Sequence, residues 1–483
     1  MIFNSLTFFG FFICFFFLYW FVFNKNAKNQ NIILLIGSYV FYAWTDWRFL
    51  FFLIAVSALN FFLGIYIEKG TKYKRLLLYI GLLQGIGFLA YFKYYNFFIS
   101  SFNDAFSLLN VNISLQTLNI IIPLGISFFT FRTISYILDV DKGKIEPTRD
   151  WIVFFNYVSF FPTVLSGPID KAKLFVPQLE KKRIFNYEQA VDGMRQILWG
   201  LFKKIVIADN CAIFTNQIFD NYQTHSGSTL LFGAFIYTIQ LYADFSGYSD
   251  MAIGFSRLIG FNIAKNFDFP FFSQNIVEFW KKWHISLTSW LTEYVFTPLS
   301  ITFRDLDKLG LILAIIINFT IVGIWHGANW TYVLFGFLHG CFFIPYILNG
   351  TMNKKKKIDK TKLLPSLREF LNMVVTFTLV MFTFILIKSN NIWQAYLYIS
   401  KILSKSILTI PDFSTLGNKN VLTVLILILF FFVCEWKGRG SNFAIENIGL
   451  NWRKQFRYTL YFILIITLFW FGGKEQQFIY FKY

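Results

Sequence analysis

Apolar runs about as long as a membrane is thick recur from one end of this chain to the other. The hydrocarbon core of a bilayer is about 30 Å thick, and roughly 20 helical residues cross it. We therefore expect an all-α, polytopic integral membrane protein. The runs are Leu6–Phe23, Phe49–Ile67, Leu76–Phe92, Leu309–Trp325, Trp330–Leu348, Phe370–Ile387, Val421–Trp436 and Tyr458–Phe471, with a shorter one at Ile32–Trp44.

The composition favours lipid over water as the solvent of this surface. Of the 483 residues, 56% are hydrophobic and 14% charged, whereas soluble domains carry about 25% charged residues. One membrane-embedded domain over residues 1–483 is expected in place of a soluble protein with a very large core. The first run, Leu6–Phe23, lacks a basic leader and a small-residue cleavage site, so we expect a retained helix and not a signal peptide.

The positive charge lies between the apolar runs. The formal net charge is +18, and its main clusters lie at residues 69–75, 354–362 and 437–457. This distribution fits the positive-inside rule better than a nucleic-acid-binding face. Placing the clusters in the cytoplasm puts the N-terminus and the C-terminus outside, and no nucleic-acid partner is expected.

Cysteine spacing and short motifs exclude several classes of site. The four cysteines (14, 211, 341 and 434) form no Cys-x-x-Cys pair, so neither a zinc site nor a disulfide framework is supported. The sequence also lacks His-Glu-x-x-His, Walker A and Gly-x-Ser-x-Gly motifs. No metal site is expected.

The centre of the chain, residues 118–298, is apolar but broken by prolines and polar residues. Broken helices at membrane depth persist only inside protein or along a water-filled cavity. We expect an internal funnel or re-entrant region there, walled by the flanking helices. The sequence has no internal repeat, which weakens a secondary transporter as the alternative.

His326 is the leading candidate for chemistry. It lies in Gly323-Ile-Trp-His-Gly-Ala-Asn-Trp330, between two apolar runs. An imidazole can take or give a proton near neutral pH, and a general base in a dry site is its chemical use. A buried neutral histidine bonded to a backbone carbonyl is the equally weighted alternative. Asn329, in the same break, is a candidate substrate-binding residue.

His284 is the second candidate, in Glu278-Phe-Trp-Lys-Lys-Trp-His-Ile-Ser-Leu-Thr-Ser-Trp290. Lys281 and Lys282 precede it and are candidate substrate-binding cations. An interfacial histidine on a Trp-rich amphipathic helix is the alternative interpretation. We expect a structural role for His339 and a loop position for His225.

Two carboxylates and three hydroxyls gather in Asp244-Phe-Ser-Gly-Tyr-Ser-Asp250. From this cluster we take Asp244, Ser246, Tyr248 and Asp250 as candidate substrate-binding residues, able to order water or a sugar or to orient a histidine. The alternative is a polar turn at a helix end, with Asp250 capping a following helix.

The chain ends in an aromatic tail, residues 472–483, that the topology above places outside. Tyr480 is a candidate hydroxyl nucleophile there. An aromatic anchor at the membrane interface is the more common use of such an ending.

Five sequence blocks follow one another in order along the chain. They are Pro123-Leu-Gly-Ile-Ser-Phe-Phe-Thr-Phe131, Phe161-Pro-Thr-Val-Leu-Ser-Gly-Pro-Ile169, Asp244-Phe-Ser-Gly-Tyr-Ser-Asp-Met-Ala-Ile-Gly254, Phe279-Trp-Lys-Lys-Trp-His-Ile-Ser-Leu287 and Gly323-Ile-Trp-His-Gly327. Together they resemble the membrane-bound O-acyltransferase (MBOAT) superfamily, and within it the bacterial polysaccharide O-acetyltransferase branch (PatA/AlgI-like). The likeness covers nearly the whole chain.

The resemblance implies a ring of transmembrane helices around a thinned central funnel or tunnel, with the catalytic centre within about residues 118–348. It implies catalytic roles for His326 and His284 and a tyrosyl ester relay at Tyr480. The donor would be cytoplasmic acetyl-CoA, with no permanently bound cofactor and with Lys281 and Lys282 near its phosphates. A departure from the family pattern is Thr292-Glu293-Tyr294, where Arg-Asp-Tyr is usual.

The expected function is therefore transfer of acetyl across the bacterial cytoplasmic (inner) membrane toward an extracytoplasmic polysaccharide, with peptidoglycan as the first choice. A periplasmic acetyltransferase of the SGNH type would be the partner, and membrane lipid the surroundings. Alginate or another exopolysaccharide, or D-alanyl transfer to teichoic acid, are alternatives. A transporter of an acyl donor or a lipid-linked sugar is the alternative from another class.

Overall fold

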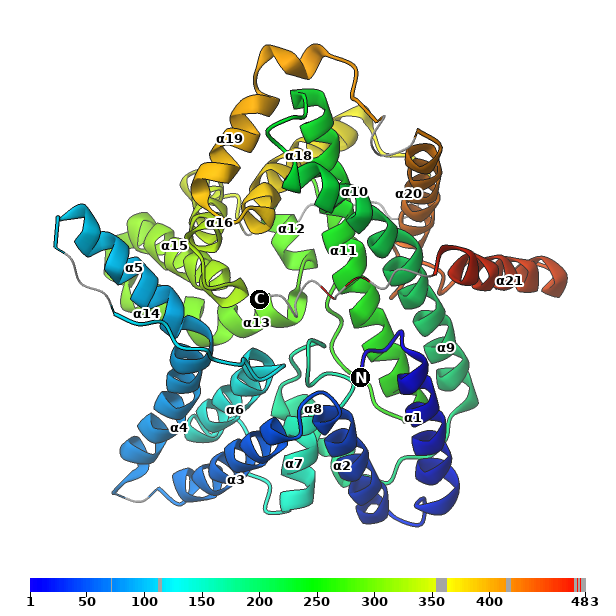
Figure 1. The fold of residues 1–483 in the computed structure, drawn as a ribbon. Coiled ribbons are helices and arrows are strands. Elements are labelled where there is room, and N and C mark those ends of the chain that lie inside the picture. Colours follow the sequence, from blue (N-terminus) through cyan, green and yellow to red (C-terminus); the bar gives the residue numbers. More distant parts are fainter. Residues whose placement is uncertain are drawn as a thin grey trace. The chain divides into compact units, whose positions relative to one another are not determined.

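In the computed structural model, all regular secondary structure of the described residues is helical (Figure 1). These are residues 1–70, 72–111, 115–352, 363–413, 418–472, 476 and 478, and they contain no strand. The multi-pass helical membrane protein expected from the sequence is confirmed. Six helical segments in this described part are long and apolar enough to cross a membrane: Arg48–Glu68, Lys74–Leu108, Arg304–His326, Trp330–Leu348, Leu367–Lys388 and Asn420–Gly438.

The chain folds into two compact units. Unit 1 comprises Met1–Gly193 and Ala252–Ala264, and unit 2 comprises Met194–Met251 and Lys265–Tyr483. Helices α9 (Tyr187–Leu201) and α11 (Gly227–Leu258) each run from one unit into the other. The single domain over residues 1–483 and the ring around a funnel stay predictions.

Unit 1 owes much of its core to phenylalanine. On α1, the Phe8 and Phe12 rings lie 4.8 and 4.7 Å from Phe255, and Phe15 lies 5.3 Å from Phe161. Tilted and edge-on aromatic pairs at these distances add to the free energy of burial. Besides parts of α9 and α11, the helices of unit 1 are α1 Leu6–Phe17, η1 Leu18–Val22, α2 Ala27–Ala43, α3 Arg48–Glu68, α4 Lys74–Leu89, η2 Ala90–Tyr94, α5 Tyr95–Leu108, α6 Ile126–Asp141, α7 Trp151–Ser159 and α8 Ala172–Glu180.

Two of the sequence blocks, residues 123–131 and 161–169, meet in unit 1 through one buried arginine. Arg132, which directly follows the first block on α6, is 1% exposed. Its guanidinium donates to the Thr163 hydroxyl and, at 3.3 Å, to the Pro168 carbonyl. Because residues 160–171 are not helical, their carbonyls need such donors when buried. These two blocks therefore carry structure in unit 1.

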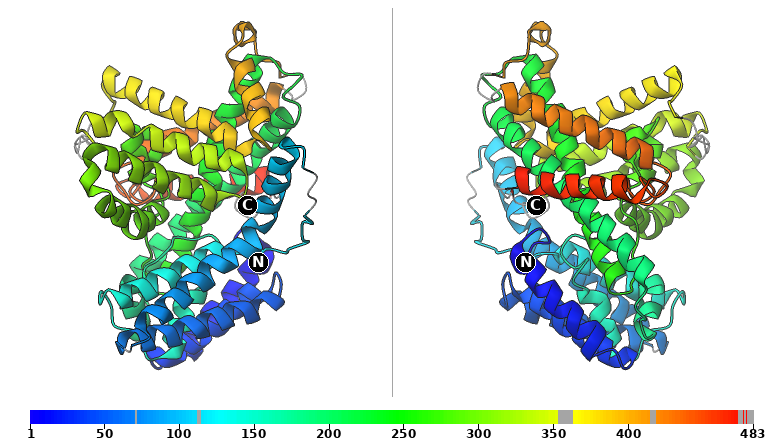
Figure 2. Two further views of the ribbon diagram at one scale, coloured as in Figure 1. Left: turned by 90° about the vertical axis from the view of Figure 1, so that its left-hand side faces the viewer. Right: turned by 90° about the vertical axis from the view of Figure 1, so that its right-hand side faces the viewer.

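Unit 2 holds most of the membrane-capable segments. Figure 2 shows α20 and α21 as two separate rods, drawn orange and red. The helices of unit 2 are η3 Phe202–Ala208, α10 Asp209–Asp220, η4 Pro270–Phe272, α12 Ile276–Lys282, α13 Ile285–Leu291, η5 Thr292–Phe296, α14 Thr297–Thr302, η6 Arg304–Leu306, α15 Asp307–His326, α16 Trp330–Cys341, α17 Ile344–Leu348, α18 Leu367–Lys388, α19 Ile392–Ile402, η7 Lys405–Leu408, α20 Asn418–Gly438 and α21 Lys454–Phe471.

The broken centre expected at residues 118–298 is present only in part, because helix continues without a gap through α9, η3 and α10 and again through α11. Short helices and loops fill the rest of it, and α11 continues unbroken for 32 residues. The interpretation of residues 244–250 as a polar turn at a helix end is therefore wrong. Their polar side chains meet partners inside the protein, described below, so the helix has no need to end where the apolar stretch ends.

Candidate active site

His284 occupies an unusual backbone position between α12 and α13. Its φ and ψ are 46° and 51°, in the left-handed region, which residues other than glycine adopt uncommonly and often at functional sites. The conformation is supported from the neighbouring loop, since the Ile285 amide donates to the Asn266 carbonyl at 2.8 Å. The imidazole is fully buried. The chain therefore turns sharply here and directs one side chain inward.

The side chain of Asn266 fixes the tautomer of His284. Asn266 Oδ1 lies 3.4 Å from the backbone N–H of Ser286, which can only donate, so the oxygen is the atom on this side. The same oxygen lies 3.0 Å from His284 Nδ1. Nδ1 must therefore carry the proton and donate it, and in the neutral ring the lone pair is on Nε2.

Helix α11 contacts both Asn266 and His284. Asn266 Nδ2 donates to Ser249 Oγ at 3.1 Å, and the Phe245 ring lies edge-on to the His284 ring at 4.6 Å. Ser249 and Phe245 are one helical turn apart, so they point to the same side of α11. The helix thus orients the imidazole both through a hydrogen-bonded chain and through packing.

His284 lies outside the six membrane-capable segments, and its charge state follows from its surroundings. Burial holds the pKa of His284 well below its usual range, and the nearby His326 lowers this pKa further. Both effects disfavour the imidazolium form. The ring is therefore neutral at physiological pH and acts as a hydrogen-bonding group rather than as a cation.

His326 is the last residue of α15 and meets His284 inside unit 2. The two ring centroids lie 6.2 Å apart, and His326 is 7% exposed. Trp325 and Phe335, both buried, lie 5.1 and 6.2 Å from its ring. The side chains around His326 are thus interior ones, and the structure brings together the two histidines that the sequence singled out.

The position of His326 depends on how closely α15 and α16 approach. A Cβ atom on Gly323 would collide with the Tyr332 carbonyl oxygen, and one on Gly336 with that of Phe319. Only glycine allows two helix backbones to come so near. The two helices therefore form a tight hairpin, and the end of α15 holds His326 at a fixed depth.

His339 has the structural role that the sequence favours. Its Nδ1 accepts from Trp280 Nε1 at 3.1 Å. Its Nε2 lies 2.9 Å from Thr383 Oγ1, whose own proton goes to the Val380 carbonyl. Both ring nitrogens are therefore engaged in joining α12, α16 and α18. His225 lies in the loop before α11, as expected.

The carboxylates of α11 are neutralised by two adjacent lysines. Lys203 Nζ lies 2.6 Å from Asp250, and Lys204 Nζ lies 2.8 Å from both Asp244 and Asp209. Lys203, Lys204 and Asp244 are almost fully buried. Buried charges persist only when they are paired. These contacts give Asp244 and Asp250 a role in holding α11 against η3.

Gly247, in the middle of the same cluster, makes these ion pairs possible. A Cβ atom there would lie 2.8 Å from the Gly200 carbonyl oxygen, and a Cβ on Gly200 would lie 2.7 Å from that of Gly247. The backbones of α9 and α11 therefore touch at this crossing. The next residues form a π-helix, η3, a local irregularity common at functional sites. Ser246, beside the crossing, is buried.

The described part of the tail also reaches this helix. Lys204 Nζ donates to the Gln476 carbonyl at 3.0 Å. The Phe478 ring is 1% exposed, stacks on Tyr248 at 4.7 Å and lies 6.3 Å from Phe245. The tail is thus anchored on the helix that supports His284. Tyr480 lies outside the described residues.

The other candidate substrate-binding residues have these surroundings. Lys281 is exposed, and Lys282 pairs with Glu278 at 2.8 Å. Asn329 caps α16 by accepting from the Thr331 amide at 3.0 Å, and its amide group donates to a further backbone carbonyl at 2.8 Å. Their substrate contacts stay predictions. Among the described residues no group of His, Cys, Asp and Glu side chains is arranged to hold a metal ion.

Sequence reasoning missed several polar residues that build this site. Lys203 and Lys204 lie in the apolar stretch Leu198–Ala208, where a buried cation requires an acidic partner. That signal was readable. Glu435, buried on α20, accepts from Trp199 Nε1 at 3.1 Å and from the Tyr242 hydroxyl at 2.6 Å, and it was readable in the same way. Asn266 carried no such signal, because amides are common in loops.

Comparison with known proteins identifies the family of this chain. The family model of MBOAT, the membrane-bound O-acyltransferase family, matches residues 146–394, which include both histidines. A "Probable alginate O-acetylase AlgI" of Azotobacter vinelandii is 35% identical over 77% of this chain and 72% of its own length. The "Peptidoglycan O-acetyltransferase" of Helicobacter pylori is 32% identical over 82% of this chain and 78% of its own.

A "Teichoic acid D-alanyltransferase" of Streptococcus thermophilus is 30% identical over 56% of this chain and 69% of its own length. These relatives are named for moving different acyl groups to different acceptors. The family model covers residues 146–394 of this chain, and two of these relatives are 35% and 32% identical to it over most of its length. The chain therefore belongs to the membrane-bound O-acyltransferase (MBOAT) family and is an acyltransferase.

Proposed function

We propose that this protein moves acetyl groups from cytoplasmic acetyl-CoA to an extracytoplasmic polysaccharide, with peptidoglycan as the acceptor. The observation that carries the proposal is the meeting of two buried histidines, 6.2 Å apart, in a chain built of membrane-capable helices. Proton transfer in a site shielded from water is the chemistry that two such rings serve.

His326 acts as the general base. It takes the proton of the acceptor hydroxyl while the hydroxyl oxygen attacks the thioester carbonyl. The carbon–sulfur bond breaks, the new ester forms, and the CoA thiolate takes the proton from His326. His284 stays neutral and presents Nε2, in the tautomer that Asn266 sets. General base catalysis supplies roughly 10²- to 10⁴-fold, so positioning supplies the rest.

The first acceptor is the hydroxyl of Tyr480, which then passes the acetyl group outward. Phe478 is anchored beside Phe245, whose ring packs on His284. Tyr480 follows Phe478 by two residues, and two extended residues span at most about 7 Å. This anchoring of Phe478 supports Tyr480 as the first acceptor.

Several features support the direction of transfer and the acceptor. Clusters of Lys and Arg between the apolar runs support the proposal of a bacterial inner-membrane protein with its donor side in the cytoplasm and both termini outside. The peptidoglycan O-acetyltransferase relative matches 82% of this chain. An alginate-type exopolysaccharide is the second candidate, because a probable alginate O-acetylase is 35% identical to this chain. An extracytoplasmic SGNH-type acetyltransferase would complete the transfer.

The test uses the full chain in proteoliposomes supplied with acetyl-labelled acetyl-CoA. We expect free CoA and acetylated protein from the wild type, and neither from His326→Ala. His225→Ala, a histidine in a loop, is the matched control and keeps wild-type release. Intact acetyl-CoA crossing the bilayer without CoA release would make the protein a transporter. Peptidoglycan is the acceptor if cells carrying the wild type have ester-linked acetate on peptidoglycan and cells carrying His326→Ala have none. Acetate found only on exopolysaccharide would make exopolysaccharide the acceptor instead.

A further inference from the structure

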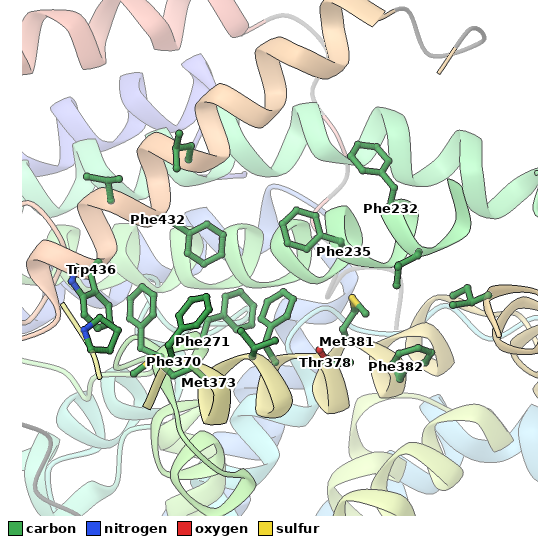
Figure 3. Close-up of a pocket in the computed structure, with 18 of the residues that line it drawn as sticks. Phe232, Phe235, Phe271, Phe370, Met373, Thr378, Met381, Phe382, Phe432 and Trp436 are labelled. Atoms are coloured by element: carbon green, nitrogen blue, oxygen red, sulfur yellow. The ribbon is translucent and has the colours of Figure 1, made fainter. Parts of the chain in front are cut away.

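A large apolar cavity lies within unit 2, away from the histidines. Its volume is about 1370 Å³, and α11, α18 and α20 contribute most of its lining. Figure 3 shows Phe235, Phe271 and Phe432 facing this space. Neither His284 nor His326 is among the lining residues. Because ordinary ligand pockets measure roughly 300–1,000 Å³, this cavity suits a larger and more apolar occupant.

The length of the cavity matches one leaflet of a membrane. Along α18 the lining extends from Phe370 to Phe382, which is roughly 18 Å at 1.5 Å per residue. Half of a hydrocarbon core about 30 Å thick is about 15 Å. Phe370 and Leu429 in the lining are 53% and 66% exposed, so the cavity opens sideways. A hydrocarbon chain lying parallel to α18 fits it.

The two ends of the cavity differ in charge. One end carries Trp436 and the exposed cation Lys437, and the Arg439 guanidinium lies 4.0 Å above the Trp436 ring. At the other end Ser228 and Thr409 bond to each other at 3.2 Å. Trp with Lys or Arg is the usual composition where a protein meets lipid headgroups, and such cations attract anionic lipid.

We propose that this cavity is a binding site for an anionic glycerophospholipid. One acyl chain lies between α11, α18 and α20, and the phosphate lies at Lys437 and Arg439. The buried Glu435 is no competitor for these cations, because its carboxylate accepts from Trp199 and Tyr242. The site is separate from the proposed acetyl transfer and does not depend on it.

The test is native mass spectrometry of the full chain, purified in detergent and mixed with phosphatidylglycerol or phosphatidylcholine. We expect the wild-type protein to retain more phosphatidylglycerol than phosphatidylcholine. Leu429→Trp fills the cavity and lowers bound phospholipid at least fivefold. Ile426→Trp is the matched control, because Ile426 is equally lipid-exposed on α20 but lies outside the lining, and it binds like wild type.

A second pair of variants tests the headgroup. Lys437→Ala lowers the preference for phosphatidylglycerol about fivefold, the effect of one cation near the phosphate. Lys454→Ala, an exposed lysine at the start of α21, leaves the preference unchanged. Wild-type lipid retention by Leu429→Trp, or an equal loss in Ile426→Trp, overturns the site. An unchanged preference in Lys437→Ala overturns the anionic headgroup.

Discussion

Asn266 offers the sharpest test of how the site works. Replacing it by alanine removes the acceptor of His284 Nδ1 and of the Ser286 hydroxyl, and the donor to Ser249. A buried hydrogen-bonding group left without its partner costs about 1–3 kcal/mol. If a free energy of this size, from the hydrogen bond that orients His284, is lost in the transition state, turnover falls roughly 5- to 150-fold.

The assay is CoA release by purified protein, expressed per folded molecule. Asn156→Ala is the matched control: Asn156 is also buried, and its amide donates to two carbonyls, those of Asn31 and Ile152. It should lower the unfolding temperature and leave turnover per folded molecule unchanged. Asn266→Ala should lower both.

The pH profile separates positioning from mere stability. Asn266→Asp sets a carboxylate beside Nδ1, which stabilises the imidazolium and raises the pKa of His284. Turnover requires the neutral ring, so activity should be lost as pH falls, and the acid limb of the profile should move to higher pH in this variant. Wild-type turnover in Asn266→Ala, together with an unmoved acid limb in Asn266→Asp, would refute the reasoning.

Three further predictions concern the contacts of α11. Lys204→Met removes the cation that the buried carboxylates of Asp209 and Asp244 share and should cost about 3–5 kcal/mol of stability, measured by thermal unfolding in detergent. Gly247→Ala forces a Cβ against a backbone oxygen at 2.8 Å and should cost about 1–3 kcal/mol, whereas Gly87→Ala, with open space around it, costs nothing measurable. Phe478→Ala should keep acetyl-CoA binding but slow acetyl transfer at least tenfold; Trp470→Ala, 81% exposed, keeps both.

The sequence predicts that this is a membrane protein because a membrane-spanning helix needs a certain length and an apolar composition, and both can be seen in a short stretch of sequence. The run Trp330–Leu348 was predicted with the bounds that the structure gives. The catalytic roles proposed for His326 and His284 come from the resemblance, since flanking residues alone leave each histidine equally open to a structural interpretation. Their meeting depends on a contact between residues 42 positions apart in the chain, which no local pattern encodes.

Other features lay beyond the sequence for physical reasons. The left-handed turn at His284 has no glycine to mark it, and hydrogen bonds with Asn266, 18 residues earlier in the chain, stabilise it. The polar cluster of α11 looked like a helix end because its partners, Lys203 and Lys204, come from a different segment. A helix continues through polar residues when neighbours satisfy them.

Four neighbouring residues of α11 face four separate tasks: Asp244 binds the lysine that holds Gln476, Phe245 packs on His284, Tyr248 stacks on Phe478, and Ser249 bonds to Asn266. A small rotation or slide of this one helix would disturb the tail and the imidazole at the same moment. Substitutions in this stretch should therefore be strongly non-additive. A change in the residues around His284 would therefore also alter how the tail is held, and a change in the tail would alter the position of the imidazole.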